Sequence, residues 1–171
     1  MSLDAQGREA VAAWTLPQEL ESYRWVASPL KRAMETARIL GIEPALEPCL
    51  VEMSWGRWEG LRIKDLRDEL DATMDKSMLQ GLDFRRPGGE SPRDVQRRIA
   101  PWLATVAATG QATAAVTHKG VIRAAYSLAN GWDMTAKPPD KLNDNAVHHF
   151  LIDGDRSLLI NRLNVPLEGP R

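Results

Sequence analysis

Short apolar runs lead directly into helical patterns at two places in the sequence. YRWVA at 23–27 is strand-like, and it is followed at 28–41 by a segment with helix start and stop signals, in which Ser28 is expected to cap the helix. The same pattern recurs at 113–117, which is strand-like, and at 121–130, which is helix-like and is expected to end at Gly131. Strands that alternate with helices predict an α/β domain with a mostly parallel central sheet flanked by helices. Ligands of such sheets bind beyond the carboxyl ends of the strands.

The other elements follow from similar signals. A short helix is expected near the start of the chain, broken near Pro17, and a short extended piece at 45–52. Residues 63 to about 70 are expected to be helical, and a longer helix runs from about 91 to 110, kinked or divided at Pro101. Two strand-like runs, 146–153 and 157–163, predict a hairpin at Gly154-Asp155.

Length and composition limit the classes of protein that the chain can represent. With 171 residues, the whole of 1–171 is expected to form one domain. The net charge of −1 gives no general attraction to nucleic acid or to an anionic membrane surface. A single cysteine, Cys49, fits a reducing compartment, and no apolar run approaches a membrane span. We therefore expect a cytoplasmic protein with no nucleic-acid or membrane partner.

Three residues are candidates for chemistry. His118 lies where the strand at 113–117 meets the following helix, although it could equally be a structural histidine. Arg32 lies in the first turn of its helix, where a cation is unfavourable by about 0.3–1 kcal/mol unless an anion binds there. Glu52 precedes a turn rich in Gly and Trp and can serve as a general acid. Taken singly, Arg32 and Glu52 also fit ordinary surface charges.

Four segments, taken together and in order, resemble the histidine phosphatase superfamily, which has the phosphoglycerate-mutase-like fold. They are SPLKRAMETA, LVEMSWGRWEG, RPGGES and VTHKGVIRA, and the resemblance extends over about 3–163. It implies that Arg32 lines a phosphate pocket, that Glu52 is the proton donor and that His118 is the second histidine of the pocket. It also implies a small phosphorylated metabolite or inorganic phosphate as ligand, and no cofactor.

The nucleophilic histidine of that family lies in an Arg-His-Gly segment, and these 171 residues contain no such segment. LDAQGREA resembles the stretch that follows it, so the chain is expected to be N-terminally incomplete, lacking the first strand, and inactive as given. A non-catalytic phosphate-binding pseudoenzyme or an interaction module is the alternative. Because the missing strand lies beside the strand that leads to His118, either another segment closes the gap or a second copy does, as a homodimer.

Departures from the mutases of the family favour a phosphatase. The stretch Glu52-Met53-Ser54-Trp55-Gly56 differs from the one with which mutases grip a phosphoglycerate, and the following insertion is short. Lys119, Arg85 and Arg86 are expected to help hold an anionic substrate, although each also fits a surface charge. The remaining clusters are expected to be structural: Arg93, Arg97 and Arg98 on a solvated helix face, and His148 and His149 on opposite faces of a strand, with no metal site.

Overall fold

A computed structural model describes residues 1–61, 79–155 and 157–167. The first half of the chain contains α1 (Ala5–Ala12), the 3-10 helix η1 (Gln18–Ser22), β1 (Arg24–Ala27), α2 (Lys31–Ile39), β2 (Ala45–Leu46) and the 3-10 helices η2 (Pro48–Leu50) and η3 (Gly56–Trp58). The second half contains the 3-10 helix η4 (Gly81–Asp83), α4 (Pro92–Thr109), β3 (Thr113–Val116), α5 (Lys119–Asn130), β4 (Ala146–Ile152) and β5 (Leu158–Pro166). The helix expected from residue 63 lies outside the described residues.

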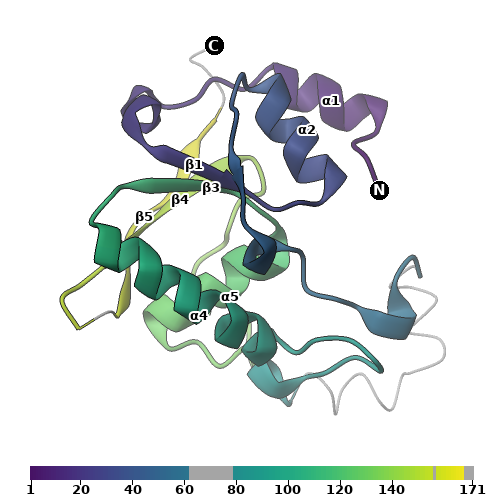
Figure 1. Cartoon of the computed structure of the whole chain (residues 1–171). Helices are drawn as coiled ribbons and strands as arrows, with labels where there is room; N and C mark the ends of the chain where they lie inside the picture. Colours follow the sequence, from purple (N-terminus) through teal and green to yellow (C-terminus); the bar gives the residue numbers. More distant parts are fainter. Residues whose placement is uncertain (62–78, 156, 168–171) are drawn as a thin grey trace.

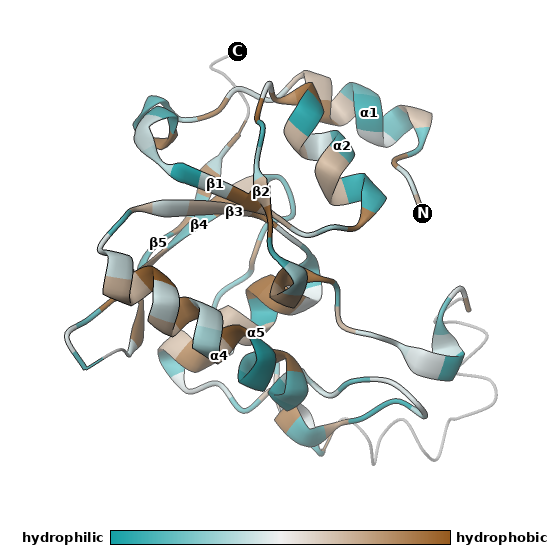
Figure 2. Cartoon of the chain, in the orientation of Figure 1, coloured by the Kyte–Doolittle hydropathy of each residue, from teal (hydrophilic) through white to brown (hydrophobic). Residues whose placement is uncertain are grey.

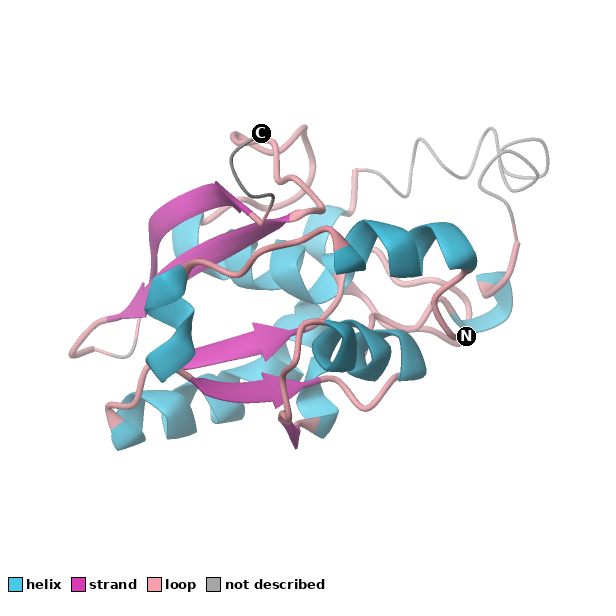
Figure 3. Cartoon of the chain, turned by 90° about the horizontal axis from the view of Figure 1, so that it is seen from above, coloured by secondary structure: helices cyan, strands magenta, loops and turns pink. Residues whose placement is uncertain are grey.

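The strands form two sheets. The first is parallel, in the order β2-β1-β3, with Val26 of β1 between Ala45 and Ala115. The second is the antiparallel pair β4-β5, which confirms the predicted hairpin. Figure 3 shows the two sheets as separate units that lie side by side.

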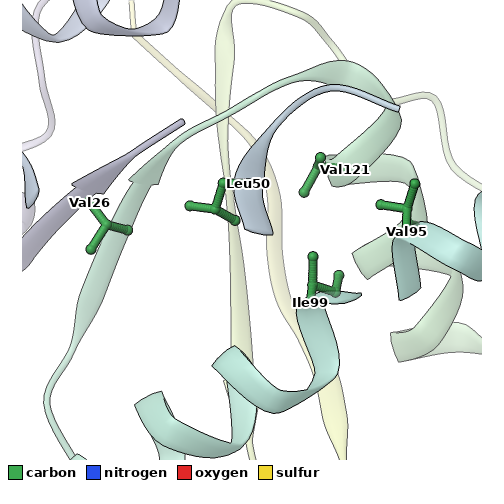
Figure 4. Close-up of a cluster of buried hydrophobic side chains, with 6 residues drawn as sticks. Val26, Leu50, Val95, Ile99 and Val121 are labelled. Carbon is green, nitrogen blue, oxygen red and sulfur yellow. The ribbon is translucent and has the colours of Figure 1, made fainter. Parts of the chain in front are cut away.

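Helices cover both faces of the parallel sheet, as expected of an α/β domain. In Figure 1, α1 and α2 lie above β1 and β3, and α4 and α5 lie below them. In Figure 2 these helices alternate hydrophilic and hydrophobic residues, as helices with one apolar side do. The core between the sheet and the lower helices is shown in Figure 4, where Val26, Leu50, Val95, Ile99 and Val121 converge.

Local signals determine where the helices of the second half begin and end. The Ser91 side chain accepts a hydrogen bond from the Asp94 amide and the Asp94 side chain accepts one from the Ser91 amide, so α4 starts with a capping box. Gly110 and Gly131 end α4 and α5 with φ angles of 62° and 72°, which glycine adopts without strain. Pro101 does not divide α4, which is continuous from Pro92 to Thr109; packing of this helix on α5 and η2 outweighs the missing amide.

β3 is an edge strand among the described residues. It pairs with β1, and β4 pairs with β5, so no described segment closes the far edge of β3. Ala115 in the middle of β3 is exposed. The prediction that another segment of the chain fills this edge is therefore not met by the described residues, and pairing with a second copy stays a prediction.

Candidate active site

His118 lies at the carboxyl end of β3, where it is the N-cap residue of α5. Its side chain is only 7% exposed, and its Nε2 atom is 2.8 Å from the Oγ atom of Ser28. Ser28 follows β1 directly, and its amide donates to the Val116 carbonyl at 2.9 Å. The parallel register of β1 and β3 therefore brings Ser28 and His118 together at one edge of the sheet.

Ser28 was predicted only as the cap of the following helix, and its contact with His118 was not predicted. The N-cap residue of α2 is instead Leu30, whose amide donates to the Ser28 Oγ at 3.3 Å. The serine is fully buried. The residue lies one position beyond an apolar strand, at the edge where ligands bind, and that position was the signal that could have identified it.

His118 is uncharged at neutral pH. Burial, which is the largest cause, and the positive charges of Arg32 and Arg98 together lower its pKa to about 4. An uncharged imidazole can donate from one ring nitrogen and accept at the other, so one hydrogen bond joins it to the Ser28 hydroxyl in either tautomer.

Arg32 occupies the first turn of α2, which follows β1 and therefore begins at the same edge as His118. Its side chain is half-buried, and among the described residues no carboxylate lies within ion-pair distance of it. A helix N-terminus already carries partial positive charge, so an unpaired guanidinium there creates a local preference for an anion.

Glu52 is tied to the helix that His118 caps. Its Oε1 atom accepts hydrogen bonds from the amide of Gly120, at 3.0 Å, and from that of Met53, at 2.8 Å. A Cβ atom on Gly120 would lie 2.3 Å from Oε1, so only glycine permits this approach. The structure thus places Glu52, His118 and Arg32 in one region, at the start of α5 and α2.

Arg98 fixes the segment that leads to Glu52, which corrects its assignment to a solvated helix face. Its side chain is 20% exposed and forms an ion pair with Glu90, at 2.8 Å. The guanidinium also donates to the carbonyl of Cys49 and, at 2.7 Å, to that of Val51. Arg93 and Arg97 lie on the solvated side, paired with Asp83 and Asp94.

The single cysteine lies in the segment that Arg98 holds, just before Glu52. Cys49 packs against the apolar core, and its carbonyl accepts from Arg98. Burial and, to a lesser extent, the neighbouring Glu47 carboxylate together raise the pKa of the thiol to about 12. The thiol is therefore protonated and unreactive at neutral pH.

Arg86 lies close enough to Glu52 for the two charges to interact, and its role in holding an anion stays a prediction. Its guanidinium stacks on the Trp55 ring at 3.7 Å, and its buried Nε atom has no hydrogen-bond partner in the part of the chain that the structure describes. Burial lowers its pKa, whereas the Glu52 carboxylate acts to raise it. The Glu90 carboxylate accepts from the Ser54 amide at 2.9 Å, which joins the loop that carries Arg86 to the loop that carries Glu52.

The other two predicted substrate-binding residues each form an ion pair with a nearby carboxylate. Arg85 pairs with Asp94 at 2.6 Å and donates to the Gly89 carbonyl, so its charge stabilises its own loop. Lys119 is 61% exposed and pairs with Asp144 at 2.9 Å. Neither contact excludes a bound anion, and both roles stay predictions.

The described residues contain no group of three or more His, Cys, Asp or Glu side chains that could hold a metal ion. His148 contacts the Asn143 carbonyl at 3.2 Å and His149 contacts Glu19 at 3.4 Å, so the two histidines serve different neighbours. None of the described helices is both long enough and apolar enough for a bilayer crossing. The arrangement supplies two cations, one buried neutral histidine and one carboxyl group, which suits an anion and a proton transfer.

Comparison with known proteins identifies the family. The model of the histidine phosphatase superfamily (branch 1) matches residues 1–165. A bifunctional protein of Mycobacterium tuberculosis is 40% identical over 78 residues, which are 43% of this chain and only 21% of that protein. Phosphoserine phosphatase 1 of Hydrogenobacter thermophilus is 26% identical over 145 residues, which are 81% of this chain and 68% of that protein.

Solved structures share the fold. A mycobacterial glucosyl-3-phosphoglycerate phosphatase, in complex with inorganic phosphate, superposes with a TM-score of 0.81 at 21% identity, over 99% of this chain and 90% of that one. An Escherichia coli protein described as an α-ribazole-5'-P phosphatase superposes with a TM-score of 0.74 at 18% identity, over 99% and 87%. At these identities the likeness confirms the phosphoglycerate-mutase-like fold.

Proposed function

Because the chain belongs to the histidine phosphatase superfamily (branch 1), we propose that it is the scaffold of a phosphomonoesterase that acts on a small phosphate ester. Arg32 and His118 hold the phosphoryl oxygens, and Glu52 gives a proton to the leaving alcohol. The observation that carries the proposal is the guanidinium of Arg32, which no carboxylate of the described residues pairs, beside the buried His118, with Glu52 bound to the start of α5. A related fold binds inorganic phosphate, and the same protein has been seen with VO3, which supports an anion of this kind.

The proposed chemistry needs a nucleophile that these 171 residues do not contain in an Arg-His-Gly segment. The nucleophilic histidine would lie on a strand that pairs with the free edge of β3, next to His118. Its ring nitrogen forms a P–N bond while the ester P–O bond breaks, and the alcohol leaves with the proton of Glu52. Water then attacks the phosphorus, the P–N bond breaks, and Glu52 takes a proton from that water.

His118 contributes to binding through its hydrogen-bonding state. The imidazole is uncharged when the site is empty, and an arriving dianion favours its protonated form, which then donates to the phosphoryl oxygens. Arg32 offers a planar guanidinium with two parallel donors. These groups stabilise the charge on the equatorial oxygens during transfer.

A second function, phosphate binding without turnover, is favoured by one observation, the absence of an Arg-His-Gly segment from the sequence. The test compares the 171-residue chain with a version extended by an N-terminal strand that ends in Arg-His-Gly. The substrate is p-nitrophenyl phosphate. We expect turnover with the extended version only, and its loss in Glu52→Gln and His118→Gln. Failure of the extended version to turn over, with phosphate binding retained, would support the binding function instead.

Phosphate binding is measured on the chain as it stands, by thermal unfolding at increasing phosphate concentration. A ligand that binds only the folded state raises the unfolding temperature. We expect the rise to vanish in Arg32→Met and to persist in Arg38→Met, which removes the same charge from an exposed position in the last turn of α2. Equal responses of these two variants would contradict both functions.

A further inference from the structure

A basic cavity of about 380 Å³ lies against α5, beside the candidate active site. Its lining comes from the first two turns of α5 and from the segment after that helix: Lys119, Arg123, Trp132, Lys137, Pro138, Lys141 and Leu142. Four of these seven residues are cations. The cavity is therefore suited to an anionic ligand of small-molecule size.

The walls of this basic cavity are held in place by hydrogen bonds. The Tyr126 hydroxyl donates to the Asp140 carboxylate at 2.8 Å and accepts from the Asp140 amide at 2.9 Å, which anchors the 137–142 segment to α5. On the other side, the Asn164 amide group donates to the Lys141 carbonyl at 2.8 Å. The Trp132 indole donates to the Ala136 carbonyl at 3.1 Å. The cavity is thus formed before any ligand arrives.

Arg123 is the cation of the cavity that a bound anion would stabilise most. Its side chain is half-buried and stacks over the Trp132 ring at 5.0 Å, and no described carboxylate forms an ion pair with it. Burial lowers its pKa, yet a guanidinium stays charged in a protein. Lys137 and Lys141 also lack an ion-pair partner among the described residues, and Lys119 alone pairs, with Asp144. A bound anion would pair with the half-buried Arg123, for which the described residues offer no carboxylate, while the exposed Lys137 and Lys141 add positive charge nearby.

The cavity and the candidate active site meet at the start of α5. His118 caps this helix, Lys119 is its first residue, and Arg123 lies one turn further along the same side as Lys119. Gly120, between them, holds Glu52. A ligand with its phosphoryl group at Arg32 and His118 therefore has the basic cavity within reach along one helix.

We propose that the basic cavity binds a second anionic group of the substrate, so that the substrate class is a phosphate ester that carries a further phosphate or carboxylate. This inference rests on the proposed function for the position of the first phosphate. Lys119 lies between the two sites, Arg123 binds the distal anion, and Lys137 and Lys141 add charge at the rim.

The test uses a series of linear alkanediol bisphosphates of increasing chain length, each compared with the monophosphate of the same length. Binding to the 171-residue chain is measured by calorimetry. At the length that spans both sites, we expect the bisphosphate to bind about 10-fold tighter or more than its monophosphate, the gain typical of charge-assisted hydrogen bonds. Arg123→Met, which keeps the apolar contact with Trp132, is expected to reduce this ratio to about two, the statistical advantage of two phosphates.

Two further variants make the result decisive. Arg38→Met removes a charge elsewhere and is expected to keep the full ratio, and Lys137→Gln with Lys141→Gln lowers the ratio without altering a buried side chain. A ratio near two at every chain length, or an undiminished ratio in Arg123→Met, overturns the inference while the proposed function stands. Arg32→Met is expected to weaken both ligands. If Arg32→Met binds the monophosphate as tightly as the wild type does, the result counts against the proposed function itself. If it binds the bisphosphate as tightly as the wild type does, the ligand does not bridge the two sites and the inference is overturned.

Discussion

Acid should destabilise this protein through His118, by an amount that the structure allows to be worked out. The pKa of the imidazole falls from 6.5 in the unfolded chain to about 4 in the folded protein, mainly because the ring is buried. Between these two values the unfolded state binds more protons, so the free energy of unfolding rises with pH. The stability is complete above pH 6.5 and is lost as the pH falls toward 4. At 1.36 kcal/mol per pH unit, the loss is about 3 kcal/mol.

The measurement is urea unfolding at pH 7, 6, 5 and 4, for the wild type and for His118→Gln, which can still hydrogen-bond to Ser28. All other titrating groups, including His148 and His149, are present in both proteins, so their effects on the free energy of unfolding cancel in the difference. We expect the wild type to lose about 3 kcal/mol more than the variant between pH 7 and pH 4. Parallel profiles, within about 0.5 kcal/mol of each other, would refute the assignment of His118 as a buried neutral group.

Repeating the urea unfolding with sulfate, an anion that remains charged between pH 7 and pH 4, tests whether an anion binds near His118. Sulfate bound near His118 favours the imidazolium form and raises its pKa, so the acid loss should shrink when sulfate is added. The same addition to His118→Gln should leave the slope of its profile unchanged. A sulfate effect of equal size in both proteins would show that the anion binds away from His118.

Three substitutions test the supports of the site. Ser28→Ala leaves the buried His118 nitrogen without its partner, and we expect a loss of about 1–3 kcal/mol in urea unfolding, with no loss refuting the hydrogen bond. Gly120→Ala places a methyl group against the Glu52 carboxylate, so this flexible side chain must move and lose its hydrogen bond to the residue 120 amide. We expect a loss of about 1 kcal/mol in urea unfolding. In the N-terminally extended version turnover should also fall, and an unchanged rate would show that Glu52 takes no part in catalysis. Arg98→Met leaves a half-buried carboxylate unpaired, so a loss of about 3 kcal/mol or more is expected from thermal and urea unfolding, and a shift below about 1 kcal/mol would mean that the clamp contributes little.

Local signals in the sequence predicted most of the described elements. The helix ends are determined by contacts with neighbouring backbone groups, so they can be predicted without knowing the fold. The examples are the capping box of Ser91 and Asp94 at the start of α4 and the glycines that end α4 and α5, Gly110 and Gly131. The parallel sheet and the hairpin followed from the alternation of strands with helices and from the turn at 154–155. The family resemblance depended on four short segments and is confirmed by the family match.

Contacts between distant segments could not be predicted. Ser28 meets His118 only because β1 and β3 pair in one register, across 90 residues of chain. Arg98 has the spacing of a surface residue, and its partners Cys49 and Val51 lie more than 40 residues away. Of the cations that line the basic cavity, only Lys119 was predicted to hold an anion, because Arg123 and Lys141 come to line one cavity only when the segment after α5 folds back.

The segment before Glu52, which Arg98 holds through the carbonyls of Cys49 and Val51, contains a residue whose chemical modification can report when the segment opens. That residue is Cys49. With a pKa of about 12, the Cys49 thiol in the closed structure presents almost no thiolate to an alkylating reagent at neutral pH. We therefore expect modification to proceed mainly through molecules in which this segment has opened, so that its rate follows how often the segment opens. Because the chain has no other cysteine, a single mass increment reports the opening of the segment that leads to Glu52. The closed population can thus be followed in the unmodified sequence, with and without phosphate.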